Sequence, residues 1–292
     1  FEVNLGNQRV FGSVGWHNVG RSWEGLNAWL DRLDYRLDAF WLKRRELLFS
    51  NSEGDFDILV GNVTLTNPAI QILIVFERDS NQGALEDDFE GTKRFSVGAY
   101  GTHKANQLDI EYNGVYQFGS RTVIIGENEE EYDIAAFLIT AEVGITLDPE
   151  KKARVAAGID YASGDDDDSD DKVESYNNLY YTGHKFRGYM DYFLSSTEYG
   201  LIDLMLRGQV APTDGWLLKA DIHFFSAAAD RQIGPNQTSK SIGSEIDLTV
   251  STTRVRGVTI VGGASVFLPS DDFAGEDADP GLWTYGMLIA DF

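Results

Sequence analysis

The connections between the extended segments of this chain alternate between long and short along its whole length. Fourteen segments alternate apolar and polar residues with a period of two, which is the pattern of β-strands. They cover residues 2–8, 22–30, 35–43, 57–65, 70–78, 95–104, 108–118, 135–146, 154–162, 199–208, 216–225, 244–251, 258–267 and 282–290. Seven long connections, residues 119–133 and 226–243 among them, alternate with six tight turns. A meander with long loops at one end and tight turns at the other is typical of a transmembrane β-barrel.

The proline positions support this division into strands. Proline cannot donate a hydrogen bond to a strand ladder, and all six prolines fall between the segments. Greek-key connections of a sandwich would break the strict alternation, and no propeller repeat of roughly 40–50 residues is visible. We therefore expect an all-β fold, an antiparallel up-and-down transmembrane β-barrel with about 14 strands, in which residues 1–292 form a single domain.

The two faces of each strand differ in polarity. In residues 108–118, for example, Leu108, Ile110 and Tyr116 alternate with Asp109 and Glu111. In a barrel the apolar row would face lipid and the charged row a wet lumen, whereas in a soluble sandwich the apolar row would be the core. Periodicity does not decide between the two, but aromatic residues near the strand ends favour the barrel, as in membrane girdles.

Charge and composition exclude several classes of function. The chain has 24 Lys plus Arg against 47 Asp plus Glu, a net charge of −23, which argues against a nucleic-acid partner. It has no cysteine, so thiolate catalysis and cysteine-based metal centres are excluded. No apolar stretch approaches the roughly 20 residues of a membrane helix.

Few side chains are arranged for chemistry. His223 and Asp221 share a strand face, but no serine constellation accompanies them, so we expect no enzyme activity and no cofactor. The acidic run Asp165, Asp166, Asp167 and Asp168 is a weak candidate for a divalent cation, since clustered carboxylates suit hard cations. It lacks the spacing of a dedicated calcium loop, so a solvated loop is the favoured interpretation.

Short sequence motifs are spread across the whole chain. They include residues 6–12 (GNQRVFG), 23–26 (WEGL), 36–40 (RLDAF), 116–119 (YQFG), 160–165 (DYASGD), 182–191 (TGHKFRGYMD), 220–225 (ADIHFF), 243–247 (GSEID) and 266–269 (VFLP). Together they resemble the alginate-export family of outer-membrane β-barrels. Each motif is weak by itself, and together they are fairly specific. The resemblance implies an 18-stranded outer-membrane channel of a diderm bacterium that passes an exopolysaccharide or acts as a porin. About four N-terminal strands would then precede those seen here, with a self-contained 14-stranded barrel as the other interpretation.

The expected pore lining is charged and contains more acids than bases. Ten acids and five bases fall on the rows assigned to the lumen, a mixture that disfavours a polyanion such as alginate and suits neutral or cationic solutes. The residues proposed to line the pore are Arg36, Asp38, Glu77, Lys104, Asp109, Glu111, Glu142, Arg154, Asp160, Asp203, Arg207, Lys219, Asp221, His223, Glu245 and Asp247.

The long connection at residues 163–198 is a candidate constriction. Its His184, Lys185 and Arg187 could fold into the mouth of the barrel, or the loop could pack on the barrel rim. The resulting hypothesis is a passive channel for polysaccharide or small hydrophilic solutes, in contact with the lipid bilayer and lipopolysaccharide, with periplasmic export partners also expected. The alternative is a plugged structural or binding barrel whose acidic extracellular loops contact a partner or a surface layer.

Overall fold

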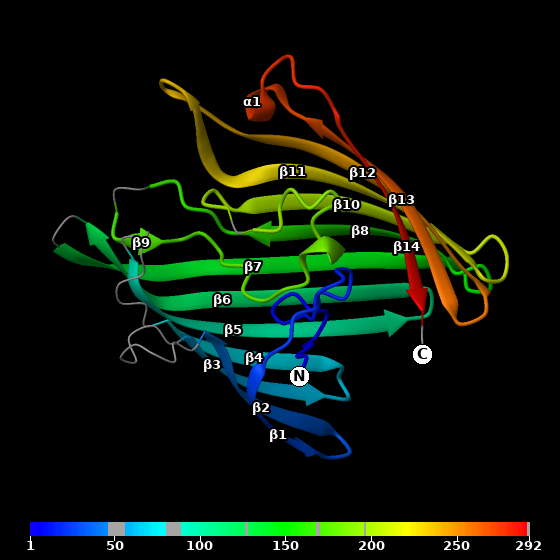
Figure 1. The fold of residues 1–292 in the computed structure, drawn as a ribbon, viewed down its shortest axis with the longest axis horizontal. Helices are drawn as coiled ribbons and strands as arrows, with labels where there is room; N and C mark the ends of the chain where they lie inside the picture. The colour runs from blue at the N-terminus through cyan, green and yellow to red at the C-terminus, as the bar shows by residue number, and fades with distance from the viewer. Residues whose placement is uncertain (46–55, 80–88, 126–127, 168–169, 196, 291–292) are drawn as a thin grey trace. The chain divides into compact units, whose positions relative to one another are not determined.

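The computed structural model describes residues 1–45, 56–79, 89–125, 128–167, 170–195 and 197–290. Within them it contains fourteen strands, one short 3-10 turn at Gly183–Lys185 and one short helix, α1, at Asp271–Ala274 (Figure 1). The strands are β1 Glu24–Asp31, β2 Tyr35–Arg45, β3 Phe56–Leu65, β4 Ile70–Asp79, β5 Phe89–Ala105, β6 Leu108–Ile125, β7 Asn128–Asp148, β8 Ala153–Ala162, β9 Lys172–Val173, β10 Leu201–Val210, β11 Trp216–Gly234, β12 Gln237–Val255, β13 Val258–Pro269 and β14 Gly281–Ala290.

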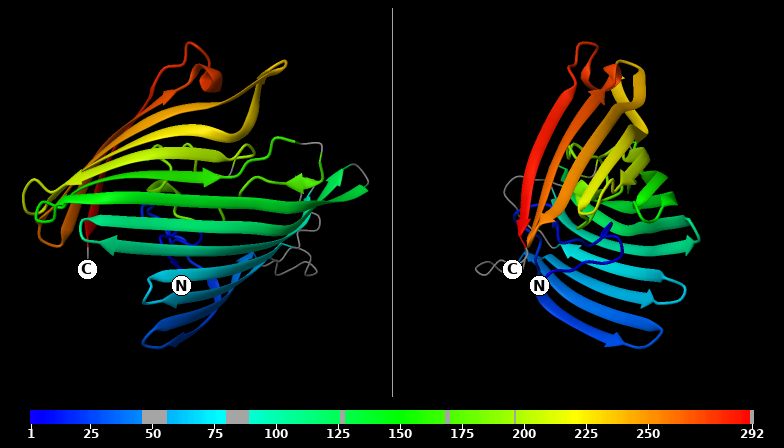
Figure 2. Two further views of the ribbon diagram at one scale, coloured as in Figure 1. Left: turned by 180° about the vertical axis from the view of Figure 1, so that it is seen from behind. Right: turned by 90° about the vertical axis from the view of Figure 1, so that its right-hand side faces the viewer.

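The strands form one sheet in chain order. Each strand lies beside its neighbours in the sequence, from β1 to β14, and only the two-residue β9 leaves this path to pair with β7 (Figure 2). The pairs whose register is defined, such as β1 with β2 and β12 with β13, are antiparallel. The fold class is therefore confirmed as an all-β antiparallel meander, which fits a β-barrel. No helix in the described ranges is long and apolar enough to cross a membrane.

Several strands are longer than the sequence pattern predicts. Residues 119–133 and 226–243 were expected to be long loops, but β6 runs to Ile125, β7 begins at Asn128, and β11 and β12 meet at a tight turn after Gly234. The residues do not alternate there, since residues 227–229 are all alanine and residues 237–241 are all polar, while the backbone ladder continues regardless of side-chain polarity. β7 has 21 residues, about twice the 9–11 that a strand needs to cross a bilayer.

The first predicted strand is wrong. Residues 1–23 form no strand, and their only ladder contact in the described structure is an isolated bridge between Phe11 and Tyr180. Positive φ angles at Gly6, Gln8 and Val14 break the extended path. Burial still alternates here, with Val3, Leu5 and Asn7 buried and the residues between them exposed, but the backbone forms no strand ladder.

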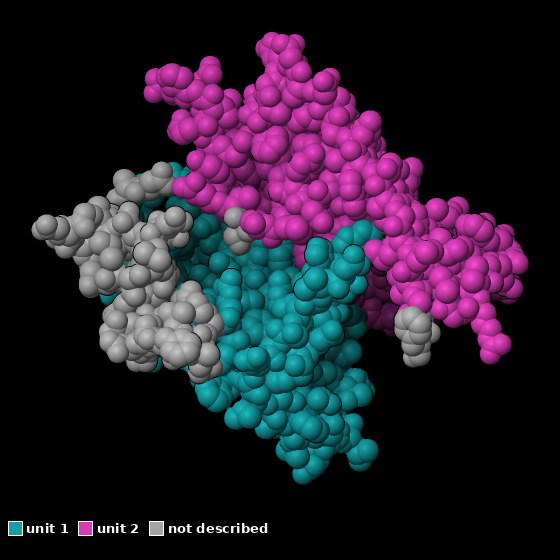
Figure 3. Space-filling model, in the orientation of Figure 1, with its two compact units in different colours: residues 1–102, 113–139, 162–182 teal, residues 103–112, 140–161, 183–292 magenta. Residues whose placement is uncertain are grey.

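The chain divides into two compact units (Figure 3). Unit 1 comprises Phe1–Thr102, Asn113–Ile139 and Ala162–Thr182, and unit 2 comprises His103–Tyr112, Thr140–Tyr161 and Gly183–Phe292. In each unit we call the face of the strands with buried side chains the inner face and the other the outer face. The expectation of a single domain stays a prediction.

The outer face of each unit is apolar and exposed. In unit 2, Leu204, Phe224 and Leu248 are 49%, 50% and 54% exposed, whereas Asp203 and Glu245 on the inner face are fully buried. In unit 1, exposed Ile74 and Tyr116 contrast in the same way with buried Glu77 and Asn62. This polarity is the reverse of a water-soluble sandwich, in which the apolar rows would be buried.

Unit 1 also has an apolar interior that the barrel pattern does not predict. Residues 1–23 and 162–182 pack against inner-face side chains of β2, β3, β4, β6 and β7 in one hydrophobic cluster. Inner positions Ile58, Val60, Leu73 and Val75 are almost completely buried beneath them. The inner face of unit 1 is therefore largely a packed core rather than a charged wall.

Candidate functional site

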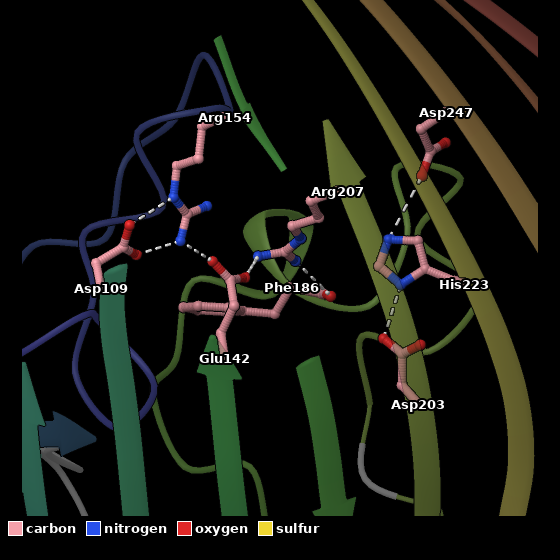
Figure 4. Close-up of polar contacts among 8 residues, drawn as sticks. All are labelled: Asp109, Glu142, Arg154, Phe186, Asp203, Arg207, His223 and Asp247. Carbon is pink, nitrogen blue, oxygen red and sulfur yellow. Dashed lines mark hydrogen bonds and ion pairs between the residues drawn. The ribbon is translucent and has the colours of Figure 1, made fainter. Parts of the chain in front are cut away.

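The inner face of unit 2 begins with a chain of ion pairs across β6, β7, β8 and β10. Arg154 of β8 donates from Nε to Asp109 Oδ2 of β6 at 3.1 Å and from a terminal nitrogen to Glu142 Oε1 of β7 at 2.8 Å (Figure 4). The second oxygen of Glu142 accepts a hydrogen bond from Arg207 of β10 at 3.0 Å. Glu142 therefore links two arginines, and each guanidinium faces at least one carboxylate.

His223 of β11 lies between two carboxylates. Its Nδ1 is 2.7 Å from Asp203 Oδ2 of β10, and its Nε2 is 3.8 Å from Asp247 Oδ2 of β12 (Figure 4). All three side chains are at most 1% exposed. Because both ring nitrogens face carboxylates, the imidazole is arranged as part of a polar network rather than as a base beside a nucleophile.

Residues 183–194, which we call the inner segment, are attached to this face by polar contacts. The backbone N–H groups of Met190 and Tyr189 donate to Glu245 Oε1 at 2.8 Å and to Asp247 Oδ2 at 3.3 Å. Arg187 pairs with Asp160 of β8 at 3.5 Å, with both side chains at most 3% exposed. The strands thus supply carboxylates, and the inner segment supplies N–H donors and one guanidinium.

Close approach of the backbone explains a glycine in the inner segment. Gly188 has a φ of +81°, and a Cβ there would lie 2.6 Å from Glu245 Oε1. Any larger residue would push the segment away from the carboxylate that binds it. Arg207 adds a weaker contact to the carbonyl oxygen of Phe186 at 3.5 Å.

Unit 1 has a smaller polar group within its apolar interior. Glu77 of β4 accepts hydrogen bonds from Tyr180 Oη at 2.7 Å and from Arg94 of β5 at 3.2 Å. Burial, with the charge of Glu77, raises the pKa of Tyr180, so its phenol stays protonated and donates. Arg21 donates to the carbonyl oxygens of Gly12 and Tyr180 and so joins residues 1–23 to residues 176–182.

Backbone contacts hold those two stretches of unit 1 together. The N–H of Gly12 donates to the carbonyl of Tyr180 at 2.9 Å, and the N–H of Thr182 donates to Gln8 at 3.0 Å. Gln117 of β6 exchanges two 2.9 Å hydrogen bonds with the backbone of Asn177. The paired stretches are therefore attached to the sheet as one body.

Comparison with known proteins identifies the family. A family model described as alginate export matches residues 1–279 of the 292. The chain belongs to the alginate export family. A search of curated proteins found no match. Membership assigns the chain to a transport family rather than to a family of enzymes, and the all-β meander fits an outer-membrane location.

The structure places most of the proposed pore residues on the inner faces. Those that are buried are Asp38, Glu77, Asp160, Asp203, Asp221, His223, Glu245 and Asp247. Asp109, Glu111, Glu142, Arg154 and Arg207 are half-buried, and Arg36, Lys104 and Lys219 are exposed. Whether these side chains line a conducting path stays a prediction. Of the proposed constriction residues, His184 and Arg187 are buried and Lys185 is exposed.

Two further bases lie on the inner rows, outside the strands predicted from the sequence. Arg94 was assigned to a loop because β5 was expected to begin at Phe95, and Arg44 was placed beyond the end of β2. Both share the row parity of inner residues, Arg94 with Ser96 and Arg44 with Leu42. Extending each strand pattern by two residues would have found them. The observed strand ends also add the acids Asp31, Asp79 and Asp148 to the inner rows, so acids still outnumber bases there.

The acidic run has a structural use in the described residues. Asp165 accepts hydrogen bonds from the backbone N–H groups of Asp167 and Glu174 at 3.4 and 3.0 Å, which orders the loop. In the part of the chain that the structure describes, no group of three His, Asp or Glu side chains is arranged to hold a metal ion. Asp168 lies outside the described residues.

Proposed function

We propose that this protein is an outer-membrane channel of the export type, through which a hydrophilic solute or a polysaccharide passes without chemistry. The observation that carries the proposal is the polarity of the sheet, whose apolar rows are exposed while its charged rows are buried. Such rows are stable only if lipid covers the outer face. The outer face would then contact the bilayer and, at the long-loop end, lipopolysaccharide.

The inner face of unit 2 favours neutral or cationic solutes over a polyanion. Arg154 and Arg207 are engaged by Asp109 and Glu142, and Arg187 is engaged by Asp160. Their positive charge is therefore compensated locally, and a polyuronate would have to displace protein carboxylates to bind them. This supports a solute other than alginate itself, although the chain belongs to the alginate export family.

A second candidate, a plugged barrel that binds rather than conducts, is favoured by unit 1. Residues 1–23 and 162–182 pack there as a hydrophobic cluster on the inner face. Apolar packing of this kind does not open by small shifts of charged groups. In this alternative the acidic long connections would contact a partner or a surface layer.

Single-channel recording in a planar bilayer under a salt gradient separates the two candidates. Steady conductance supports the channel. A reversal potential that indicates preference for cations supports the proposed solute class. Anion preference would contradict the proposed solute class. Absence of conductance from a protein that shows the heat-modifiable gel mobility of a folded barrel would contradict the channel and favour the plugged barrel.

A further inference from the structure

The outer face of unit 2 is hollowed by an apolar groove of about 710 Å³. It crosses β8, β10, β11, β12 and β13 close to the short turns that join these strands. Its floor is formed by Gly208, Ala220, Gly262 and Ala264, and its walls include Leu218 and Leu248. We call this depression the outer groove.

Strand register explains why the face is hollow here. Gly208, Ala220, Leu248 and Ala264 lie directly opposite one another across four strands, so three of the four have no side chain beyond Cβ. A Cβ added at Gly208 would have its nearest neighbour at 3.9 Å, and one at Gly262 at 3.8 Å. The space in front of both glycines is therefore open, and larger side chains would enter it without a clash.

The short turns beside the groove carry more bases than acids. Lys151 and Lys152 directly precede the first groove strand, and Arg254 and Arg256 lie at the turn between β12 and β13. The β13–β14 connection at the other end of the strands has five acids and no base. The same short turns also carry Asp148, Glu150 and Asp214, so their net charge is 4 − 3 = +1, against −5 in the β13–β14 connection. In a chain of net charge −23, an anionic group therefore meets less repulsion at the short-turn end.

We propose that the outer groove binds one acyl chain of an anionic phospholipid, with the headgroup phosphate at Lys151 and Lys152. The proposal rests on the proposed function, because it needs the outer face to lie in a bilayer. Apolar walls suit an acyl chain, and the adjacent bases suit a phosphate. Short turns of outer-membrane barrels are periplasmic, so the lipid in reach is an inner-leaflet phospholipid rather than lipopolysaccharide.

Native mass spectrometry of the detergent-purified chain, titrated with phosphatidylglycerol, tests this. The Gly208→Leu/Gly262→Leu variant fills the groove, and Gly61→Leu, on the outer row of β3 where a Cβ meets nothing within 4 Å, is the control. Displacing about two buried methylenes should weaken lipid retention roughly tenfold in the groove variant. The control should retain lipid like the unchanged chain.

A second variant tests the headgroup. Lys151→Ala/Lys152→Ala should lose preference for phosphatidylglycerol over phosphatidylcholine while still inserting into liposomes. Equal lipid retention by the groove variant and the control would overturn the proposal, as would loss of a dimer peak instead of lipid, which would assign the groove to a second copy of the chain. Failure of the unchanged chain to insert into liposomes would contradict the proposed function instead.

Discussion

At the residue scale, a buried ion pair between Arg187 and Asp160 attaches the inner segment to β8. Both side chains are at most 3% exposed, so water does not solvate either charge. Removing one member of a buried pair leaves the other uncompensated, which costs roughly 3 kcal/mol or more. We expect Arg187→Gln to lower the thermal unfolding temperature measured by circular dichroism.

The double variant separates charge from packing. Arg187→Gln/Asp160→Asn removes both charges and should recover most of the loss, because amides hydrogen-bond without a net charge. If the double variant unfolds as easily as Arg187→Gln alone, the ion pair is not what the single variant destroys.

A glycine at Gly119 lets β6 approach β5 closely. Its φ is +134°, and a Cβ there would collide with the carbonyl oxygen of Lys93. We expect Gly119→Ala to destabilise the protein by about 2 kcal/mol, since both the backbone conformation and the contact resist a side chain. Gly114→Ala on the same strand, where a Cβ meets nothing within 4 Å, should stay within about 0.5 kcal/mol in the same denaturant titration. Equal effects would contradict this account of β6.

Row parity predicts which face of the sheet a residue lies on, but not which residue it pairs with. Asp203, Asp221 and Glu245 are buried on the inner face as the alternation indicates. The partner of His223 was missed, because Asp221 shares its strand face whereas Asp203 and Asp247 reach it from neighbouring strands. Pairing across strands depends on register, which a single sequence does not specify.

At the element scale, the inner segment is held by charge-assisted hydrogen bonds and can therefore be loosened by neutralising a carboxylate. Met190 N–H donates to Glu245 Oε1 at 2.8 Å, and such a bond to a carboxylate is about twice as strong as one to a neutral group. Glu245→Gln keeps the shape and loses the charge. We expect trypsin to cut after Lys185 and Arg187 several-fold faster in this variant, because transient opening exposes both sites.

The matched control is Glu276→Gln in the exposed β13–β14 connection. It changes the net charge equally and should leave the cleavage rate unchanged. An unchanged rate in Glu245→Gln would show that the carboxylate does not hold the inner segment.

Strand existence was predictable from the sequence, and strand ends were not. Thirteen of the predicted segments coincide with strands of the meander. Residues 2–8 alternate as a strand does, yet they pack inside unit 1 because residues 162–182 supply a partner that local pattern cannot reveal. The extensions of β6, β7, β11 and β12 were missed because their residues do not alternate between apolar and polar.

At the scale of the whole molecule, the proposed channel requires that the outer face of the sheet meets lipid. Alternation in the sequence left a soluble sandwich open, and the exposed apolar rows of the structure, together with membership of the alginate export family, favour the membrane. Unit 1 has an apolar interior and unit 2 a polar one, but both units expose apolar side chains on their outer faces. The protein can work as a channel only if this apolar outer surface lies in a lipid bilayer.

The measurement that tests this most directly is spin-label accessibility in liposomes at neighbouring positions. The chain has no cysteine, so single cysteines placed at Ile110, Glu111, Leu218 and Lys219 can be labelled without background. We predict high accessibility to oxygen at 110 and 218, and high accessibility to a water-soluble nickel chelate at 111 and 219. Equal accessibility at neighbouring positions, or the reverse order, would contradict the orientation on which the proposed channel depends.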